Sequence, residues 1–187
     1  NTEIQTTTIA SNTWTVTIPV GALSDGVLDV TVVGTDNINP VTINQDIVLD
    51  RATSVSINDP LAGDNIISAG ESTRFVVFGT GEPGATVAVD ITDGTTTLSS
   101  SNEVDSSGFW EVTFDVNTLS ETTISVTATS TDIAGNVATD TASVTYDRTA
   151  SPITITTPIT VDNIINNSEA PSTPISGTAT INSNVRI

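Results

Sequence analysis

Acidic side chains recur along this sequence at nearly constant spacing. Three carboxylates occur twice, at offsets of 97, 98 and 98 residues: Asp50 and Asp147, Asp64 and Asp162, Glu71 and Glu169. An asparagine follows the middle acid in both copies, as Asn65 and Asn163. Carboxylate and amide oxygens are the ligands of Ca²⁺, a hard cation that takes about six to eight of them. The spacing therefore predicts oxygen-rich Ca²⁺ sites that repeat along the chain.

The composition excludes most other chemistry for these acids. The chain has no His, Cys or Lys, so nucleophile–base pairs and zinc sites built from His and Cys are ruled out. Hydrolysis by two carboxylates requires a single cleft in which one acid stays protonated. These acids instead recur from one segment to the next. Repetition of this kind indicates architecture, and we expect no enzymatic activity.

The charge of the chain narrows the range of partners. Twenty-two acidic residues against four Arg give a net charge of −18. Phosphate contacts need clustered basic residues, so no nucleic acid partner is expected. An anionic membrane surface would repel the chain, and no apolar stretch approaches the ~20 residues of a membrane helix, so no membrane insertion is expected. The absence of Cys excludes disulfides and fits an extracellular bacterial protein.

Polar and apolar residues alternate with the period of β-strands. Thr, Val, Ile, Ser, Asn and Gly dominate the composition, and no helical period is visible. Between residues 50 and 146 we expect seven strands, at about 53–59, 73–79, 85–92, 95–104, 109–116, 122–131 and 136–146. Turn residues separate them, including Asp93-Gly94. Seven short strands in this length predict an immunoglobulin-like sandwich. The fold class is all-β, with tandem immunoglobulin-like β-sandwich domains in a rod.

The repeat divides the chain into three parts. Residues 50–146 form a complete domain, residues 1–49 the C-terminal part of a preceding domain, and residues 147–187 the N-terminal part of a following one. We expect strands near 13–18, 27–33 and 42–49, a strand region with Ile153, Ile155 and Ile159, and another at 175–181. The sequence begins within a repeat and is expected to be a fragment. Its two outer parts are complementary pieces of one repeat, so we expect them either to pair between molecules or to belong to a longer chain interrupted at the turn equivalent to Asp93-Gly94.

The order of strands in a sandwich places the acids near the joints between domains. At the first joint we expect Asp50 and Asp132, with Glu82 as a further candidate. The second joint should have Asp64, Asn65, Glu71 and Asp147, completed by a part of the third repeat that this fragment lacks. Asp162, Asn163 and Glu169 are the equivalents in that third repeat, and Asp36 is the equivalent of Asp132 in the first. The alternative is that all of these are ordinary turn and cap residues.

Trp14 and Trp110 are equivalent, at an offset of 96 residues. An exposed Trp could stack on a sugar ring, which would suit a carbohydrate-binding β-sandwich module of a secreted glycan-active protein. Trp110 instead shares the apolar face of its strand with Val112 and Phe114. Large aromatic side chains on such a face belong to the core. We therefore predict that Trp110 is buried, and we keep the carbohydrate-binding module as the alternative function.

Five motifs resemble, in the same order, the bacterial immunoglobulin-like (BIg) repeats of giant type I-secreted adhesins. They are Gly81-Glu-Pro-Gly-Ala-Thr-Val, Gly108-Phe-Trp110, Thr131-Asp-Ile-Ala-Gly-Asn136, Asp147-Arg-Thr-Ala-Ser-Pro and Asp162-Asn-Ile-Ile-Asn with Glu169. The resemblance covers essentially the whole chain. The first repeat departs from it, because Asp36-Asn-Ile-Asn-Pro replaces Thr-Asp-x-Ala-Gly-Asn.

The resemblance implies a secreted spacer at the bacterial cell surface. Its repeats would form a rod stiffened by Ca²⁺ and would contact neighbouring repeats of the same chain. The rod would project a terminal binding region, outside this sequence, toward a host-cell glycan or receptor. Virulence and type I secretion are part of the same implication.

Overall fold

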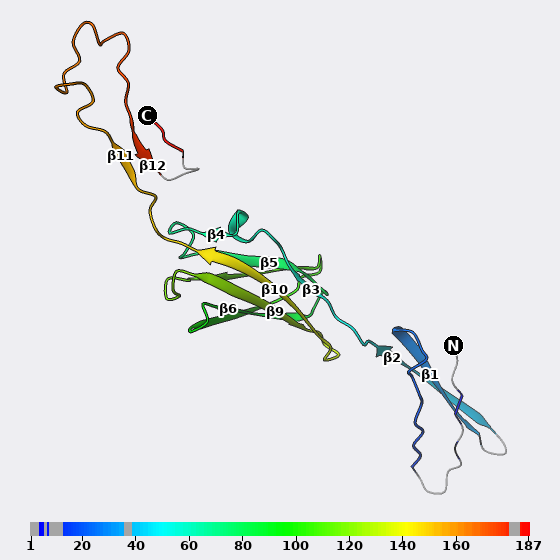
Figure 1. Cartoon of the computed structure of the whole chain (residues 1–187). Helices are drawn as coiled ribbons and strands as arrows, with labels where there is room; N and C mark the ends of the chain where they lie inside the picture. The colour runs from blue at the N-terminus through cyan, green and yellow to red at the C-terminus, as the bar shows by residue number, and fades with distance from the viewer. Residues whose placement is uncertain (1–3, 6, 8–12, 36–38, 180–183) are drawn as a thin grey trace.

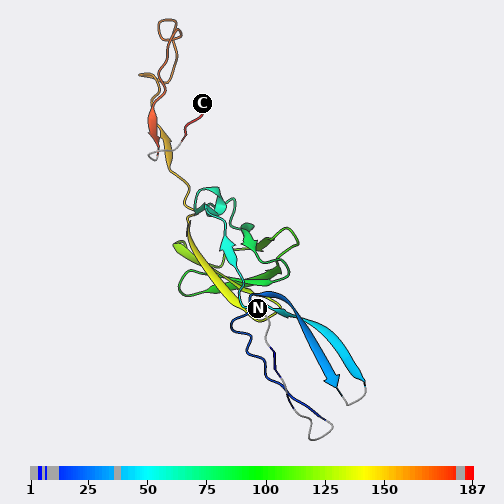
Figure 2. The same cartoon turned by 90° about the vertical axis from the view of Figure 1, so that its right-hand side faces the viewer.

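The computed structural model describes residues 4–5, 7, 13–35, 39–179 and 184–187. Figure 1 shows a central β-sandwich with a hairpin-like segment on either side of it, and Figure 2 shows the same succession from a second direction. The chain enters the sandwich at one end and leaves at the other. No helix in the described residues is long and apolar enough to cross a membrane.

Residues 50–146 form the middle sandwich, which consists of two sheets. The larger sheet has the strand order β4-β10-β9-β6-β7, and the smaller one has the order β3-β5-β8. The strands are β3 (Val55–Ile57), β4 (Ile66–Ile67), β5 (Phe75–Gly81), β6 (Thr86–Thr92), β7 (Thr97–Glu103), β8 (Phe109–Phe114), β9 (Thr123–Thr131) and β10 (Val137–Tyr146). Neighbours pair antiparallel except β4 and β10, which are parallel. The predicted immunoglobulin-like, all-β fold is confirmed.

The core lies between the two sheets of the middle sandwich. Along β6 and β8 alternate residues are buried, as the period of a strand requires. Trp110 is 1% exposed and its indole N–H donates to the carbonyl oxygen of Thr80 at 3.0 Å. The predicted burial of Trp110 is confirmed. An enclosed indole offers no face on which a sugar could stack.

The seven strands predicted for this region are all present: six have somewhat shorter bounds, and the one expected at 73–79 lies two residues later, as β5. Two features were not expected: the short strand β4 and the 3-10 helix η1 (Leu61–Gly63). Both lie in the connection between β3 and β5. Asn65 there has a φ of 62°, and its side-chain oxygen accepts the Leu61 backbone N–H at 2.8 Å. This connection is shaped by its own hydrogen bonds and by pairing with β10, which no alternation of residues reveals.

The first flanking segment is a hairpin of β1 (Gly26–Thr35) and β2 (Pro40–Leu49). These match the strands expected at 27–33 and 42–49. The strand expected at 13–18 is not formed, and Trp14 is 52% exposed. In the middle sandwich the equivalent strand β8 pairs with β5. In the described residues of the first segment no strand equivalent to β5 is present, so Trp14 has no opposite sheet to cover it. The Asp36 position lies outside the described residues.

The last flanking segment contains β11 (Ile153–Ile155) and β12 (Gly177–Ala179), which pair antiparallel. Ile159 lies in a turn region rather than in a strand, and the strand expected at 175–181 is formed at 177–179; residues 180–181 lie outside the described residues. In the middle sandwich Leu61, the equivalent of Ile159, begins η1. Ile159 therefore belongs to the connection between strands.

This last segment repeats the local structure of the middle sandwich. The pairing of Thr154 with Thr178 matches that of Ser56 with Thr80, including a bond between the two hydroxyls. Asn163 has a φ of 58° and accepts the Ile159 backbone N–H at 2.9 Å, as Asn65 does with Leu61. Residues that are 98 positions apart in the sequence therefore adopt the same local conformation.

Candidate metal centre

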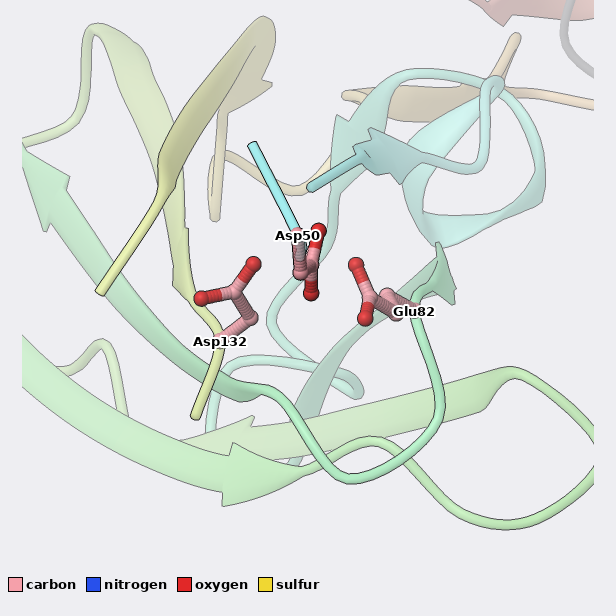
Figure 3. Close-up of side chains that lie close together, drawn as sticks. All are labelled: Asp50, Glu82 and Asp132. Atoms are coloured by element: carbon pink, nitrogen blue, oxygen red, sulfur yellow. The ribbon is translucent and has the colours of Figure 1, made fainter. Parts of the chain in front are cut away.

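Three carboxylates meet where the first segment joins the middle sandwich. Oxygens of Asp50, Glu82 and Asp132 all lie within 4.8 Å of one another. Figure 3 shows the three side chains next to each other, each coming from a different part of the chain. Asp50 follows β2, Glu82 begins the turn from β5 to β6, and Asp132 begins the turn from β9 to β10. We call this group the joint cluster.

The turn after β9 fixes the position of Asp132. Its carboxylate accepts the backbone N–H and the side-chain amide of Asn136, both at 2.8 Å. Gly135 closes the turn with a φ of 90°, where a side chain would be strained. The Asn136 amide also donates to Asp50 at 3.4 Å. Thr131-Asp-Ile-Ala-Gly-Asn136 therefore builds a rigid loop that presents one carboxylate to the linker.

Within the part of the chain that the structure describes, the joint cluster concentrates negative charge without an ion pair to a basic side chain. Asp132 is only 7% exposed, and Asp50 and Glu82 are half-buried. Desolvation raises the pKa of Asp132, but hydrogen bonds from the Asn136 side chain and from the backbone of Asn136, Gly135 and Ala134 outweigh it and lower the pKa overall. The ion pairs in the described residues, Arg51 with Asp25 and Arg148 with Glu121, do not involve the cluster. Like charges this close repel unless a cation lies between them.

The donor set of the joint cluster fits Ca²⁺. It offers carboxylate oxygens from three segments, and with no His or Cys in the chain it has nothing that would favour zinc. Asp50 and Asp132 were predicted for this joint, with Glu82 as a further candidate, and the structure brings all three together. Their role as metal ligands stays a prediction.

The opposite end of the middle sandwich contains Asp64, Asn65 and Glu71. They lie in the connection between β3 and β5, which passes beside Asp147. The backbone N–H of Asp147 donates to the carbonyl of Ile67 at 3.1 Å. In the described residues these acids do not form a three-carboxylate group like the joint cluster. Asp64 accepts the Ile66 backbone N–H, and Asp147 accepts that of Thr149. Each acid therefore stabilises its own turn, and a metal site at the second joint remains a prediction.

Glu71 caps its loop in the same way. Its carboxylate accepts the side-chain hydroxyl of Ser68 at 2.7 Å and the Ser68 backbone N–H at 2.9 Å, and these two bonds lower the pKa of Glu71. In the last segment Asp162 accepts the Ile164 backbone N–H, and Glu169 that of Asn166. The three predicted residues of the third copy, Asp162, Asn163 and Glu169, thus accept the same backbone N–H groups as their equivalents in the second copy, whereas the bond from the Ser68 hydroxyl is not repeated because Asn166 takes the place of Ser68.

Sequence reasoning missed a pair of arginine contacts at the joints. Arg51 donates to the Asp25 carboxylate at 2.7 Å and to the Leu23 carbonyl at 2.8 Å. Arg148 donates to Glu121 at 3.1 Å and lies 5.2 Å from the centre of the Tyr146 ring. Asp25 and Glu121 are 96 residues apart. The sequence shows an Asp-Arg at both joints and an acidic residue at an equivalent position before each, Asp25 and Glu121. This recurring acid could have identified the partner of each arginine.

Residues 62–147 match the Bacterial Ig domain family, Big_6. This match spans the middle sandwich from η1 to the second Asp-Arg, so we call that part the middle Ig domain. No curated protein is similar enough to the chain to count as a match.

The middle Ig domain and its flanks are similar to several solved structures. One is a tetra-tandem repeat in the extending region of a large adhesion protein, 26% identical over 86% of this chain and 40% of the other, with a TM-score of 0.48. A 1.5-MDa bacterial ice-binding adhesin is 27% identical over 84% of this chain and 53% of the other, with a TM-score of 0.41. A Ca²⁺-stabilized adhesin of an Antarctic bacterium is 28% identical over 82% of this chain and 40% of the other, with a TM-score of 0.37. The chain thus spans between 40% and 53% of the length of these three.

Proposed function

We propose that this chain is a calcium-stiffened structural repeat segment of a giant bacterial surface adhesin. It acts as a spacer and projects a terminal binding region toward a host cell or surface. The observation that carries the proposal is the joint cluster, in which the linker residue Asp50 meets two loops of the middle Ig domain. The neighbouring repeats of the same chain are its direct partners, and its place is outside the cell.

A cation at the joint cluster would couple the direction of the linker to the domain that follows. Asp50 belongs to the connection from β2, whereas Glu82 and Asp132 belong to turns of the sandwich. An ion bound by all three carboxylates would cancel the repulsion between them and would connect the linker to the two turns. The ion supplies charge compensation here, and the chain supplies the geometry, chiefly through the Asn136 bonds that orient Asp132.

The energy of such a site suits stiffening more than folding. Extracellular calcium modules have dissociation constants of roughly 10⁻⁴–10⁻³ M. With ~1 mM calcium and a dissociation constant of ~0.1 mM, binding stabilises the bound form by about 1.4 kcal/mol. That is a small part of a domain's stability, yet it shifts a joint from mostly loose to mostly fixed. Calcium outside the cell would then stiffen the segment after its secretion.

The sequence resemblance supports the choice of an adhesin. The five motifs follow the order of BIg repeats in type I-secreted adhesins, and among these the chain resembles the giant non-fimbrial adhesin SiiE. The conformational repeat at an offset of 98 residues supports tandem modules. A host glycan or receptor, and a part in virulence, belong to the distal region of such a protein.

Calcium titration by calorimetry tests the proposal. The variant D50N/D132N removes two charges from the joint cluster and should weaken the binding of its ion by at least about tenfold. The control D29N/D46N removes two charges from a directly facing pair on the β1–β2 hairpin and should leave the isotherm unchanged. Thermal unfolding without calcium verifies that the middle Ig domain is intact. Equal isotherms for D50N/D132N and the unaltered chain would contradict the proposal.

A further inference from the structure

Two buried hydroxyl groups in the middle Ig domain have no hydrogen-bond partner. They belong to Ser130 and Thr53, whose side-chain oxygens contact no donor or acceptor within the part of the chain that the structure describes. Ser130 is fully buried, and Thr53 is half-buried although its hydroxyl oxygen is enclosed. An unpaired buried hydroxyl costs stability, so such groups in proteins nearly always bind a protein atom or an ordered water. These two hydroxyls therefore indicate a polar ligand beside them.

Ser130 directly precedes the joint cluster on the inward face of β9. Alternate residues of this strand face the core, and Ile124, Val126, Ala128 and Ser130 are all buried. Asp132 continues this series two residues later and is 7% exposed. The core along β9 thus changes from apolar side chains to a hydroxyl and then to a carboxylate. The Ser130 hydroxyl is the first polar group beneath the joint cluster (Figure 3 shows the cluster itself).

Thr53 reaches the same end of the domain from the smaller sheet. It lies between Asp50 and β3, and residues 53, 55 and 57 are half-buried whereas residues 54 and 56 are exposed. Its side chain therefore faces inward, like that of Val55, which packs against the core. Val55 is paired with Gly81, the residue directly before Glu82. Because β3 also contacts β9, the two unpaired hydroxyls lie under the joint cluster on two different sheets.

We propose that the hydroxyls of Ser130 and Thr53 bind one water molecule that is also a ligand of the cation in the joint cluster. The inference rests on the proposed function, because it requires that ion. Ca²⁺ takes about six to eight oxygens, and three carboxylates that bind through one or both oxygens leave positions for water. Such a water is a strong donor, because the ion polarises its O–H bonds. Its two hydrogens match the two hydroxyl oxygens, each of which has lone pairs to accept them.

Ser130 and Thr53 are thus positioning residues for the ion. Through the water they would attach it to β9 and to the chain that leads from Asp50 into β3. Groups that orient the ligands of a metal in this way commonly change its affinity by about 10- to 100-fold. Without the ion nothing orients the water, and the hydroxyls contribute little to folding. Their removal should therefore matter only when calcium is present.

Unfolding measurements in calcium and in excess chelator, together with calorimetric titration, test the proposal. S130A and T53V each remove one hydroxyl with little change in volume. Each should weaken calcium binding at the joint cluster by roughly tenfold and reduce the rise in unfolding temperature that calcium produces. Neither should lower the unfolding temperature in chelator, because the lost hydroxyl has no partner there. The double variant S130A/T53V should bind calcium about as weakly as either single variant, because both act on the same water.

Matched variants separate a role in ion binding from a role in folding. T53S keeps the hydroxyl and should bind calcium as the unaltered chain does. T92V is the control for T53V, because Thr92 is also half-buried but its hydroxyl donates to the Thr96 carbonyl at 2.9 Å and accepts the Gly94 N–H at 3.1 Å. T92V should lower the unfolding temperature equally in calcium and in chelator and leave the calcium affinity unchanged.

D50N/D132N distinguishes failure of this inference from failure of the proposed function. If D50N/D132N binds calcium as tightly as the unaltered chain, both proposals are wrong. If D50N/D132N binds weakly while S130A and T53V bind normally, the joint cluster holds an ion but the two hydroxyls do not position it. That second result would overturn the inference alone.

Luminescence of Eu³⁺, which prefers oxygen ligands as Ca²⁺ does, counts the water molecules on the ion. Its lifetimes in H₂O and D₂O give their number, and comparison with D50N/D132N isolates the joint cluster. S130A and T53V should each carry fewer waters on the ion than the unaltered chain. A larger number would mean that the hydroxyls bind the ion directly and are replaced by water. An unchanged number would mean that the water does not depend on them, and either result would overturn the proposal.

Discussion

At the scale of single residues, Asp132 and Trp110 show how side chains are fixed by the loops and sheets around them. Asp132 is held by Asn136 and faces Asp50 and Glu82, so one residue both shapes a turn and contributes to the joint cluster. Trp110 lies between the two sheets and satisfies its N–H on Thr80. The first residue bears on the link between domains, and the second on the stability of one domain.

Replacing Trp110 with alanine should destabilise the middle Ig domain by about 3–5 kcal/mol, because it opens a cavity in a closely packed core. Denaturant unfolding followed by circular dichroism measures this change. The neighbouring Phe109 lies on the other face of β8 and is 38% exposed, with its ring 6.0 Å from that of Phe78. F109A should cost only about 1 kcal/mol. A Trp110→Ala effect as small as that of F109A would contradict the assigned burial.

Acid should weaken the middle Ig domain through its capping carboxylates. Asp93 accepts backbone N–H groups of Thr96, Ser120 and Thr95, and these bonds lower its pKa well below the usual range. A depressed pKa in the folded state means that the unfolded state binds more protons in acid. The stability from Asp93 is therefore present above the ordinary carboxyl pKa of about 4 and is lost as pH falls below it.

The variant D93N tests this contribution, because the amide keeps an acceptor oxygen but cannot titrate. The urea midpoint of the unaltered chain should fall between pH 5 and pH 3, and that of D93N should fall less. Two midpoint curves with the same slope against pH would mean that Asp93 does not contribute. Asp105 has a lowered pKa as well, chiefly from the Ser107 hydroxyl, so part of the pH dependence should remain in D93N.

At the scale of elements, the connections between strands determine how one domain follows another. The turn after β9 presents Asp132 at the N-terminal end of the middle Ig domain, and the connection with η1 and β4 lies beside Asp147 at the C-terminal end. Arg148 then ties the outgoing linker to Glu121, whose carboxylate also accepts the Arg148 backbone N–H at 3.2 Å. The arginine contacts thus fix the linker before the next strand begins.

Removing the Arg148 side chain should loosen the linker and leave the domain stable. An exposed ion pair contributes about 0–1 kcal/mol to folding, so the unfolding midpoint of R148A should hardly change. The backbone order of residues 148–151, measured by nitrogen-15 relaxation, should fall clearly. E121Q removes the other partner of the ion pair and should lower the order of the linker in the same way. R74A is the control: it removes one positive charge elsewhere in the domain and should leave the order of the linker unchanged. Unaltered order in both R148A and E121Q would show that the ion pair does not hold the linker.

At the scale of the whole molecule, three segments follow one another in a line through two joints (Figure 1). A net charge of −18 makes each segment repel its neighbours, and a divalent cation at a joint would oppose that repulsion locally. Mechanical stiffness in such a chain depends on a few linker contacts, because each domain folds around its own core.

Chelation should make the molecule more flexible. Small-angle scattering in calcium and then in excess chelator should show a shorter maximum dimension or a broader distribution of distances without calcium. D50N/D132N should resemble the chelated state at the first joint even in calcium. A scattering profile that chelator leaves unchanged would contradict stiffening by calcium.

The sequence by itself determined the fold class, the repeat and the burial of Trp110. These follow from local regularities: strands alternate with a period of two, turns carry Gly and Asp, and a duplicated motif fixes an offset. It also placed Asp50 and Asp132 at one joint, because the order of strands in a sandwich determines which loops share an end. Asp64, Asn65 and Glu71 were placed at the other joint by the same reasoning, and there the structure shows capping bonds within the loop.

Only the tertiary structure decided which of these carboxylates meet. Asp50, Glu82 and Asp132 come from positions up to 82 residues apart, and their distances depend on how three loops close over one end of the sandwich. The strand β4 and the partners of Arg51 and Arg148 were equally hidden, because each depends on a contact with a distant segment. The exposure of Trp14 has the same cause: an alternating strand is buried only where a second sheet covers it, and spacing along the chain does not report whether that sheet is present.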